Sequence, residues 1–361
     1  MENTQYDIKS MTPEEVSGLI VSLGDKKFRA KQIYQWMHQK LVSSYDEMTN
    51  VPAALRQRLA AKYPLTVLEP VRVQVSQIDG TRKYLFRLSD GNLIESVLMK
   101  YHHGNSVCIS SQVGCRMGCR FCASTIDGLV RGLLPSEMLE QIYRIQKDIG
   151  ERVDNVVVMG SGEPFDNFDN LLRFIELLNN EEGLNISARN LTVSTCGIVP
   201  RIYELADMQP QITLAISLHS PNDELRRSIM PVANKYSIDE IMKACRYYVD
   251  KTGRRITFEY SLVKDVNDTD ECAMQLVHLV KGIKCHVNLI PVNPIKERDY
   301  KQTAQAGVNH FRSRLEKCGV NATVRREMGR DIDGACGQLR RSYMESAASQ
   351  ADALNGAEQA Q

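Results

Sequence analysis

The sequence lacks the features that would assign it to a membrane or a secreted class of protein. No uninterrupted apolar stretch among its 361 residues is long enough to span a bilayer. Its start, MENTQYDIKSMTPEE, is polar and acidic and does not resemble a secretory signal. Ten cysteines without an export signal indicate metal-binding, catalytic or buried thiols rather than a disulfide framework. We therefore expect a protein of the reducing cytoplasm with no membrane partner.

The chain also lacks an excess of charge of either sign. Lys and Arg number 45 and Asp and Glu 44, which gives a formal net charge of +1. The net charge thus offers no argument for a polyanionic partner, and nucleic-acid binding would have to rest on local patches. Internal repeats are absent as well. The length allows two or three domains or one large barrel with appendages, and 43% hydrophobic residues suffice for a sizeable core.

What the sequence does contain is an alternation of short apolar strands and helices between residues 105 and 342. Strands are expected at 106–110, 153–160, 191–197, 212–219, 255–263 and 285–293, and helices at 135–150, 169–180, 237–251, 270–283 and 310–318. Such alternation produces parallel strands with right-handed crossovers. About six units of this kind predict an α/β fold, a partial (β/α)6 barrel.

Two smaller regions precede this core, and a tail follows it. Residues 1–65 predict three helices, the second of which begins with the basic residues Lys26, Lys27, Arg29 and Lys31. Basic residues oppose the dipole at a helix start, which favours a phosphate-binding surface, although a merely solvated basic face is an equal alternative. Residues 66–104 alternate with period two and predict a β-meander that contains Glu95. Residues 343–361 have little apolar content and are expected to be disordered.

The most informative stretch is CISSQVGCRMGCRFC, residues 108–122, which contains a C-x3-C-x2-C triplet. Three thiolates from one short loop can ligate three irons of a [4Fe–4S] cluster and leave the fourth iron open. A ferredoxin-type cluster would need a fourth nearby cysteine, and structural zinc would need four ligands in paired spacings. No second C-x2-C pair exists. The triplet Cys115, Cys119 and Cys122 resembles the cluster loop of the radical S-adenosylmethionine (SAM) superfamily, whose members share the partial barrel.

Polar or glycine-rich segments follow the expected strands, where parallel α/β proteins place their active residues. These segments read GSGEP, STCG, SLH and PVNP. In GSGEP, closely spaced glycines allow the backbone to approach a ligand, and Glu163 can accept from an ammonium group. The segment is not a G-x-G-x-x-G fingerprint. It resembles the segment that holds the SAM amino group in the radical SAM superfamily.

A second cysteine of interest is Cys336 in DIDGACGQLRR. Small residues flank it, and arginines near it in sequence favour the nucleophilic thiolate and would also attract phosphates. We therefore expect a reactive thiol. The remaining cysteines follow strand or helix patterns and are expected in the core or at incidental positions: Cys196, Cys245, Cys272, Cys285 and Cys318.

Together, Cys108, the cysteine loop and the segments GSGEP, VSTCGIVP, AISLHSPND, HVNLIPVNP and DIDGACGQL resemble the RlmN family of rRNA and tRNA adenine-C2 methyltransferases. The resemblance begins at FRAKQIYQWMHQK and leaves out only the tail. It implies methylation at C2 of one adenosine in the peptidyl-transferase region of 23S rRNA, protein-free or early in assembly. It also implies methylation of the adenosine 3′ of the anticodon in tRNA, with residues 1–65 as the RNA-binding appendage.

The same resemblance implies a mechanism. Cys336 takes a methyl group from one SAM, and a second SAM is cleaved to a 5′-deoxyadenosyl radical that activates the S-methyl group for addition to C2. Cys108 matches the resolving cysteine, which forms a transient disulfide with Cys336, and Glu95 matches the proton acceptor. The matching SAM contacts are Gly162, Glu163, Ser194, Ser217, Leu218, His219 and Asn293.

The cofactors implied are one [4Fe–4S] cluster per chain, held by Cys115, Cys119, Cys122 and SAM, and two SAM molecules per turnover. An electron donor such as flavodoxin with its reductase would be needed, and we expect a monomer. Three positions depart from the family pattern: Ser161 stands where Met or Ile is usual, Cys196 where Ser is usual and Gly334 where Ala is usual. None of these changes removes a catalytic group, and Cys196 adds a thiol that could compete in disulfide exchange.

Three alternatives stay open on the sequence. A Cfr-type enzyme would methylate C8 of the same adenine, and the choice between C2 and C8 depends on placement of the base. A radical SAM activase would generate a glycyl radical on a partner protein and would need neither Cys108 nor Cys336. A non-catalytic Fe–S redox module would not bind SAM.

Overall fold

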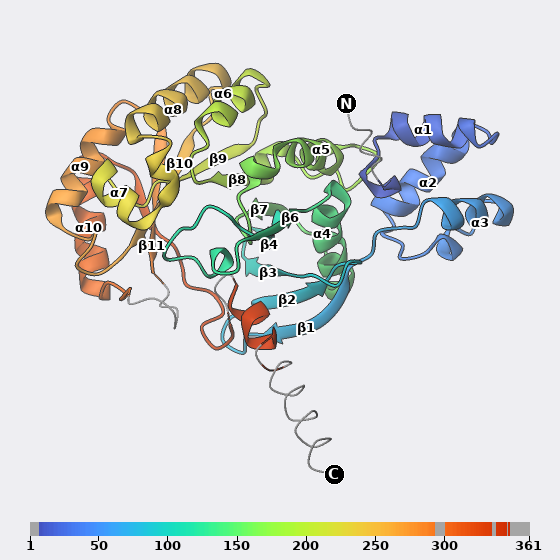
Figure 1. Cartoon of the computed structure of the whole chain (residues 1–361), viewed down its shortest axis with the longest axis horizontal. Helices are drawn as coiled ribbons and strands as arrows, with labels where there is room; N and C mark the ends of the chain where they lie inside the picture. The colour runs from blue at the N-terminus through green and yellow to red at the C-terminus, as the bar shows by residue number, and fades with distance from the viewer. Residues whose placement is uncertain (1–6, 293–299, 334–336, 345, 347–361) are drawn as a thin grey trace, which may run out of the picture.

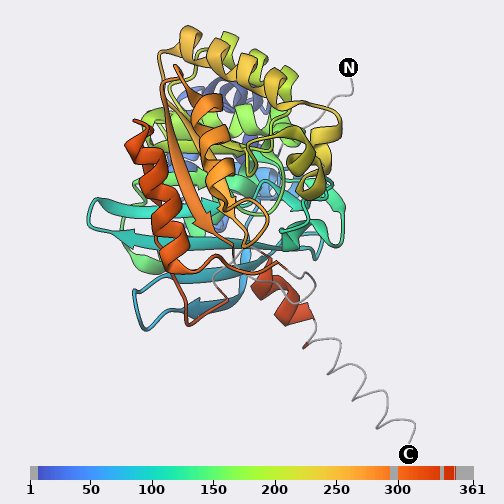
Figure 2. The ribbon, with the colours of Figure 1, turned by 90° about the vertical axis from the view of Figure 1, so that its left-hand side faces the viewer.

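The structure is a computed structural model that describes residues 7–292, 300–333, 337–344 and 346. It contains one large curved sheet with helices on its outer side, and a separate group of helices from the N-terminal residues lies at one end (Figure 1). A view turned by 90° shows that helices of the second half of the chain lie alongside the strands of the sheet (Figure 2). Among the described residues, no helix has the length and apolar character needed to cross a membrane.

The N-terminal group of helices confirms the three helices that the sequence predicts, with ends that shift by one or two residues. It comprises η1 (Ile8–Ser10), α1 (Pro13–Ser22), α2 (Phe28–His38), η2 (Tyr45–Glu47) and α3 (Ala53–Lys62). A capping box starts α1, because the side chains of Thr12 and Glu15 each accept the backbone N–H of the other. No side chain caps the start of α2, where the N–H groups of Arg29 and Ala30 donate to the backbone carbonyls of Lys26 and Lys27.

The predicted meander is present and continues into the core sheet. It comprises β1 (Glu69–Val75), β2 (Arg82–Arg87), β3 (Leu93–Tyr101) and β4 (Gly104–Ile109), and each of these strands is antiparallel to the next. On its other side β4 pairs in parallel with β7 (Asn155–Val158). The expected division after residue 104 therefore falls inside β4, within one sheet. The proposed domain boundaries stay a prediction.

The parallel part of the sheet confirms the partial α/β barrel. Its further strands are β8 (Leu191–Thr195), β9 (Thr213–Ser217), β10 (Ile256–Leu262), β11 (Cys285–Pro291) and β12 (Ala322–Val324), in the order β4-β7-β8-β9-β10-β11-β12. The helices that cover it are α4 (Pro135–Ile149), α5 (Phe168–Asn179), α6 (Val199–Asp207), α7 (Asp223–Ile229), α8 (Ile238–Thr252), α9 (Asp270–Val280) and α10 (Gln305–Lys317). The short strands β5 (Gln112–Gly114) and β6 (Leu129–Gly132) form a separate hairpin. Single 3-10 turns complete the chain: η3 (Ala123–Thr125), η4 (Pro164–Asn167), η5 (Ala188–Asn190) and η6 (Pro231–Asn234).

Strand register separates the two faces of the large sheet. Paired residues share a face, and faces alternate along each strand. The helix-covered face is apolar and buried, with Val107, Val156, Val193, Ile216, Phe258 and Leu289. The opposite, inner face carries Glu95, Cys108, Ser194, Ser217, Glu259 and Asn288. Residues far apart in sequence thus share one polar surface.

Some elements differ from the sequence-based expectation. The helices α6 and α7, the β5–β6 hairpin and the seventh parallel strand β12 were not predicted, because they are short or rich in charge. The expectation of disorder from residue 343 is wrong for residues 343, 344 and 346, which are helical with 338–342. The N–H groups of Gly337 and Arg340 donate to the carboxylate of Glu95 on β3. The acceptor of both hydrogen bonds lies on a strand that is distant in sequence, so the local composition does not reveal this helical segment. The rest of the tail lies outside the described residues.

Candidate active site

The cysteine loop lies between the strands of the β5–β6 hairpin, which brings its two ends together. Across the mouth of the loop, the N–H of Cys115 donates to the carbonyl of Gly128 at 2.8 Å. The hydroxyl of Thr125 donates to the carbonyl oxygens of Cys119 at 3.0 Å and Cys122 at 2.9 Å. Cys115 and Cys119 are buried and Cys122 is half-buried. The three predicted ligands are therefore held in one compact loop.

The environment of these thiols favours binding of a cation. Burial raises the pKa of the Cys115 thiol to about 12 and also raises the pKa of Cys119, and the neighbouring cysteines add to both rises. A bound metal would offset these effects, because its charge stabilises the thiolates. No three His, Cys, Asp or Glu side chains in the described part of the chain converge on a position for a single ion. The three soft sulfur donors fit an iron–sulfur cluster, in which each thiolate binds its own iron.

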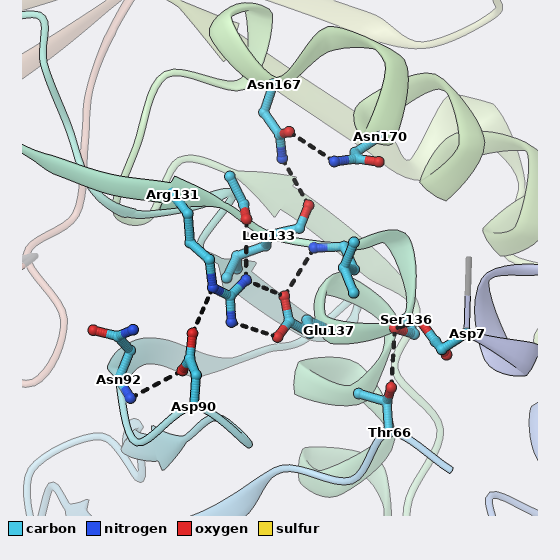
Figure 3. Close-up of polar contacts among 12 residues, drawn as sticks. Asp7, Thr66, Asp90, Asn92, Arg131, Leu133, Ser136, Glu137, Asn167 and Asn170 are labelled. Carbon is cyan, nitrogen blue, oxygen red and sulfur yellow. Dashed lines mark hydrogen bonds and ion pairs between the residues drawn. The ribbon is translucent and has the colours of Figure 1, made fainter. Parts of the chain in front are cut away.

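A polar network anchors β6, through which the chain leaves the cysteine loop (Figure 3). The guanidinium of Arg131 donates to Glu137 at the start of α4 at 2.7 and 2.8 Å and to Asp90 between β2 and β3 at 2.6 Å. Asn167 donates its amide to the carbonyl of Leu133 at 2.8 Å. These bonds connect the hairpin to α4, to the meander and to the turn before α5.

The GSGEP segment lies against β5, the strand that leads into the cysteine loop. The N–H of Gln112 donates to the carbonyl of Ser161 at 3.1 Å, and the Gln112 side-chain oxygen accepts the N–H of Glu163 at 2.9 Å. The amide of Gln112 also donates to Asp166 at 3.0 Å, and Arg116 of the cysteine loop pairs with the same carboxylate. Two motifs that are distant in sequence are therefore joined through Gln112 and Asp166.

Glu163 is buried, and both of its carboxylate oxygens accept backbone N–H groups. Oε1 accepts from Phe165 at 3.0 Å and Oε2 from Cys196 at 2.7 Å. Burial raises the pKa of Glu163, whereas these hydrogen bonds favour its charged form. Each carboxylate oxygen has a further lone pair. The side chain can therefore also accept from an ammonium group.

The predicted residues of β8 and β9 lie together at the carboxyl ends of these strands. The hydroxyl oxygens of Ser194 and Ser217 are 3.3 Å apart. Beyond β9, the N–H groups of Leu218 and His219 both donate to the carbonyl of Glu259, at 3.1 and 3.2 Å. These bonds turn the chain across the end of β10.

His219 connects this turn to the cysteine loop. Its φ is +55°, in the left-handed region, and its Nδ1 accepts the N–H of Ser261 at 3.0 Å, which leaves the ring proton on Nε2. Burial lowers the pKa of His219 to about 3, so the imidazole is neutral near pH 7. The ring packs edge-on against Phe121 of the cysteine loop, with centroids 4.8 Å apart.

Glu95 on β3 contacts both a lysine and the C-terminal helical segment. Nζ of Lys83 is 3.1 Å from Oε2 of Glu95 and donates to the carbonyl of Asp333 at 2.6 Å. The N–H groups of Gly337 and Arg340 donate to the Glu95 carboxylate at 2.5 and 2.7 Å. Glu95 therefore binds the chain on the C-terminal side of residues 334–336, and Lys83 binds it on the N-terminal side.

Cys108 is buried on β4, on the same sheet face as Glu95. A cavity of about 260 Å³ next to Glu95 is lined by Ala123 of the cysteine loop, Ser161 and Arg340, among others. Cys336, Asn293 and Gly334 lie outside the described residues.

Three buried charged residues near the site escaped the sequence analysis: Lys83, Arg226 and Glu259. Oε2 of Glu259 accepts from Asn288 on β11 at 2.9 Å, and burial raises the pKa of Glu259. A charged residue inside an apolar strand pattern is the signal that could have identified Glu259. Arg226 stands in the charged segment DELRR, and Lys83 stands among the alternating polar residues of β2, so neither was distinguishable from a solvated side chain.

Two separate parts of the chain match known protein families. Residues 109–277 match the radical SAM superfamily, and residues 6–64 match a family described as the ribosomal RNA large subunit methyltransferase N-terminal domain. The first match includes the cysteine loop, GSGEP and β7 to β10. The second covers the N-terminal group of helices.

Individual relatives are similar over nearly the whole chain. A probable dual-specificity RNA methyltransferase RlmN of Lachnospira eligens is 71% identical over 339 residues, which cover 94% of this chain and 97% of the relative. A protein of the same description from Lachnoclostridium phytofermentans is 59% identical, covering 94% and 95%. The crystal structure of a radical SAM methyltransferase from Sphaerobacter thermophilus matches with a TM-score of 0.89 at 45% identity, covering 92% of this chain and 98% of that one.

Proposed function

This chain belongs to the RlmN family of radical SAM methyltransferases, and on this basis we propose that it methylates C2 of adenine in RNA. The proposed substrates are one adenosine in the peptidyl-transferase region of 23S rRNA and the adenosine 3′ of the anticodon in tRNA. The description of the relatives as dual-specificity RNA methyltransferases supports this substrate class. So does the match of residues 6–64 to a ribosomal RNA methyltransferase domain.

A radical SAM enzyme uses a [4Fe–4S] cluster and SAM. We assign the cluster to Cys115, Cys119 and Cys122, which hold three irons and leave the fourth for SAM. When bound, the cluster supplies the electron that cleaves SAM reductively. Because Gln112 joins the cysteine loop to GSGEP, a ligand held by one motif also lies beside the other.

Each of the proposed SAM contacts offers the ligand a different group. Glu163 accepts from the amino group with its remaining lone pairs, and Gly162 lets the backbone approach. His219 offers the N–H of Nε2, because its Nδ1 is occupied by Ser261. The hydroxyls of Ser194 and Ser217, at the ends of β8 and β9, are available as donors and acceptors. The other assigned contacts are Leu218 and, by resemblance alone, Asn293.

The proposed transfer uses two cysteines. The Cys336 thiolate takes a methyl group from one SAM, which leaves as S-adenosylhomocysteine. A second SAM, cleaved to methionine and 5′-deoxyadenosine, would take up the hydrogen atom that the S-methyl group loses, and the methyl carbon forms a bond to C2. Glu95 accepts the C2 proton, and the electron that remains would return to the cluster. The Cys108 thiolate attacks the Cys336 sulfur, so the carbon–sulfur bond breaks, the released carbon takes up a proton and a disulfide forms. An electron donor such as flavodoxin with its reductase supplies the electron for the cleavage of SAM, and a two-electron thiol reductant returns the disulfide to two thiols. The enzyme acts as a monomer in the cytoplasm, where thiols stay reduced.

One contact carries this proposal. The N–H of Gly337, the residue directly after Cys336, donates to Glu95 at 2.5 Å. Register also gives Glu95 the same sheet face as Cys108. A carboxylate and two thiols from three separate segments are the groups that the proton loss and the disulfide exchange require, which supports a common role.

The test is nucleoside mass spectrometry after anaerobic reconstitution with SAM, a reductant and unmodified 23S rRNA or tRNA. We expect 2-methyladenosine from the wild type and none from Cys336→Ala. Cys318→Ala is the matched control, because Cys318 is exposed at the end of α10 and belongs to none of these motifs, and it should retain activity. Formation of 8-methyladenosine would move the protein to Cfr-type chemistry. If 5′-deoxyadenosine formed without any methylated base, the RNA assignment would be wrong.

A further inference from the structure

Arg226 on α7 is a fully buried charged group beside the candidate site, and the proposed mechanism gives it no role. Its exposed fraction is 0%. Arg227, its neighbour in sequence, is exposed. Burial of a guanidinium is unfavourable unless hydrogen bonds and opposite charge compensate it. The surroundings of Arg226 therefore need to be accounted for group by group.

Part of the compensation comes from the carbonyl groups at two strand ends. Nε donates to the carbonyl of Leu218 at 3.2 Å, and Nη2 donates to the carbonyls of Cys196 at 2.6 Å and Ser217 at 3.5 Å. Cys196 follows β8, Ser217 is the last residue of β9, and Leu218 follows it. The planar guanidinium thus joins the two strand ends that carry the proposed SAM contacts.

The remaining part of the guanidinium is not compensated by hydrogen bonds. Nη1 is buried and has no hydrogen-bond partner in the part of the chain that the structure describes. Within the same residues, Arg226 forms no ion pair with a carboxylate, since every such pair found there involves other cations. A buried donor without an acceptor is costly, which indicates that a further acceptor completes the site.

Two thiols and one carboxylate act electrostatically on Arg226, those of Cys196, Cys119 and Asp223. Cys119 and Cys196 pack in one cluster with Ile229 and Met230, which end α7, and the N–H of Arg120 donates to the carbonyl of Ile229 at 2.9 Å. Because Nη2 of Arg226 donates to the carbonyl of Cys196 at 2.6 Å, the guanidinium lies beside this cluster. Helix α7 therefore brings a buried cation next to the cysteine loop.

We propose that Arg226 is a positioning residue of the redox centre: it joins the ends of β8 and β9 and supplies positive charge and an N–H donor to the sulfur atoms of the cluster. Hydrogen bonds to sulfur and local charge set the reduction potential of an iron–sulfur cluster. A positive group next to the cluster stabilises the added electron and raises the potential. This inference rests on the proposed function only in that it needs the cluster at Cys115, Cys119 and Cys122.

The test measures the midpoint potential of the reconstituted full-length holoenzyme by a titration monitored with electron paramagnetic resonance. The variants are Arg226→Gln, which removes the charge, and Arg227→Gln, which makes the same change on the exposed side of α7. We expect Arg226→Gln to make reduction at least tenfold less favourable, a fall of 59 mV for a one-electron couple. Arg227→Gln should leave the potential unchanged.

The outcomes separate this inference from the proposed function. If the wild type binds no cluster, the proposed function fails, and this inference fails with it. If the wild type and Arg226→Gln hold equal amounts of iron and sulfide and have equal potentials, only the inference on Arg226 is overturned.

A third variant keeps the inference testable if Arg226→Gln does not assemble. Arg226→Lys keeps the charge but loses the planar fork to the three carbonyls. If the charge acts on the cluster, Arg226→Lys assembles it with a potential close to that of the wild type. If Arg226 serves only as a structural fork, Arg226→Lys fails to assemble the cluster in the same way as the glutamine variant, and the proposal is overturned.

Discussion

Gly114 and Gly162 occupy positions where a neighbouring backbone takes the space of a side chain. A Cβ on Gly114 would lie 2.0 Å from the carbonyl oxygen of Gly128, and a Cβ on Gly162 would lie 2.7 Å from the backbone nitrogen of Gln112. Both residues also have left-handed φ values, +74° and +107°. The first close approach shapes the cysteine loop, and the second brings GSGEP onto β5. These two glycines therefore position the site through backbone contact.

At this scale we predict that Gly162→Ala weakens SAM binding at least tenfold, about 1.4 kcal/mol. The added methyl group meets backbone that cannot move without displacing β5, and the left-handed φ adds strain. The measurement is isothermal titration of the reconstituted protein with SAM, together with thermal unfolding.

Gly150→Ala is the matched control for this prediction. Its φ is +66° and nothing lies within 4 Å of the added Cβ, so it should lose about 1–2 kcal/mol of stability through strain alone. Its SAM affinity should equal that of the wild type. Unchanged affinity in Gly162→Ala would contradict the close-approach argument.

Among the elements, α2 shows that only some of the basic residues in a charged sequence pattern are available to bind a ligand. Of the four basic residues at its start, Arg29 donates to the carbonyl of Asn50 at 2.8 Å, and Lys31 pairs with Glu182 at 2.7 Å. Both residues therefore make contacts within the protein, which neither the phosphate-binding surface nor the solvated face predicted from the sequence included. Lys26 and Lys27 are exposed at an uncapped helix start. The surface available for phosphates is narrower than the sequence suggested.

We predict that the double variant Lys26→Glu, Lys27→Glu weakens RNA binding without changing SAM cleavage. Two lost phosphate contacts should make the slope of log affinity against log salt concentration shallower by about 1.4–1.8. The measurement is RNA binding at several salt concentrations. Lys243→Glu, Lys251→Glu on α8 makes the same charge change far from α2 in the chain. If both double variants weakened RNA binding equally, the effect would come from the overall charge of the protein and not from phosphate contacts of α2.

For the whole molecule, the decisive contact is the one between the N-terminal helices and the barrel. Nζ of Lys9 donates to Glu140 of α4 at 2.6 Å and to the carbonyls of Val42 and Thr66 at 3.3 and 2.8 Å. Both side chains of the ion pair are fully buried. Burial lowers the pKa of Lys9, and Glu140 opposes this change. The pair fixes the position of the N-terminal helices relative to the site.

Lys9→Met should therefore lower the free energy of unfolding by about 1–3 kcal/mol, because two carbonyls and one carboxylate oxygen lose their buried donor, while Glu140 keeps its ion pair with Arg144. Lys31→Met is the control, since Lys31 forms a glutamate pair of similar length on the surface. We expect it to cost less than about 1 kcal/mol. Urea denaturation of both variants measures the difference. Similar losses in the two variants would contradict the role of burial.

The sequence by itself determined the features that depend on short spacings. The cysteine triplet, GSGEP, the period-two meander and the alternation of strands and helices are local patterns, and the structure reproduces the corresponding loop and elements. A few residues of contiguous chain set the geometry of such a pattern. The same locality explains why the tail was assigned from its composition and its helical start was missed.

Only the tertiary structure decided which of these pieces act together. Register gives Glu95, Cys108 and Ser194 one face of the sheet, and Gln112 joins the cysteine loop to GSGEP. Lys83 and Arg226 resemble solvated charges in sequence and are buried beside the site. Their positions depend on strand pairing and helix packing between distant segments, and a shift of one residue in register would turn each strand side chain to the opposite face. Local spacing does not contain that information.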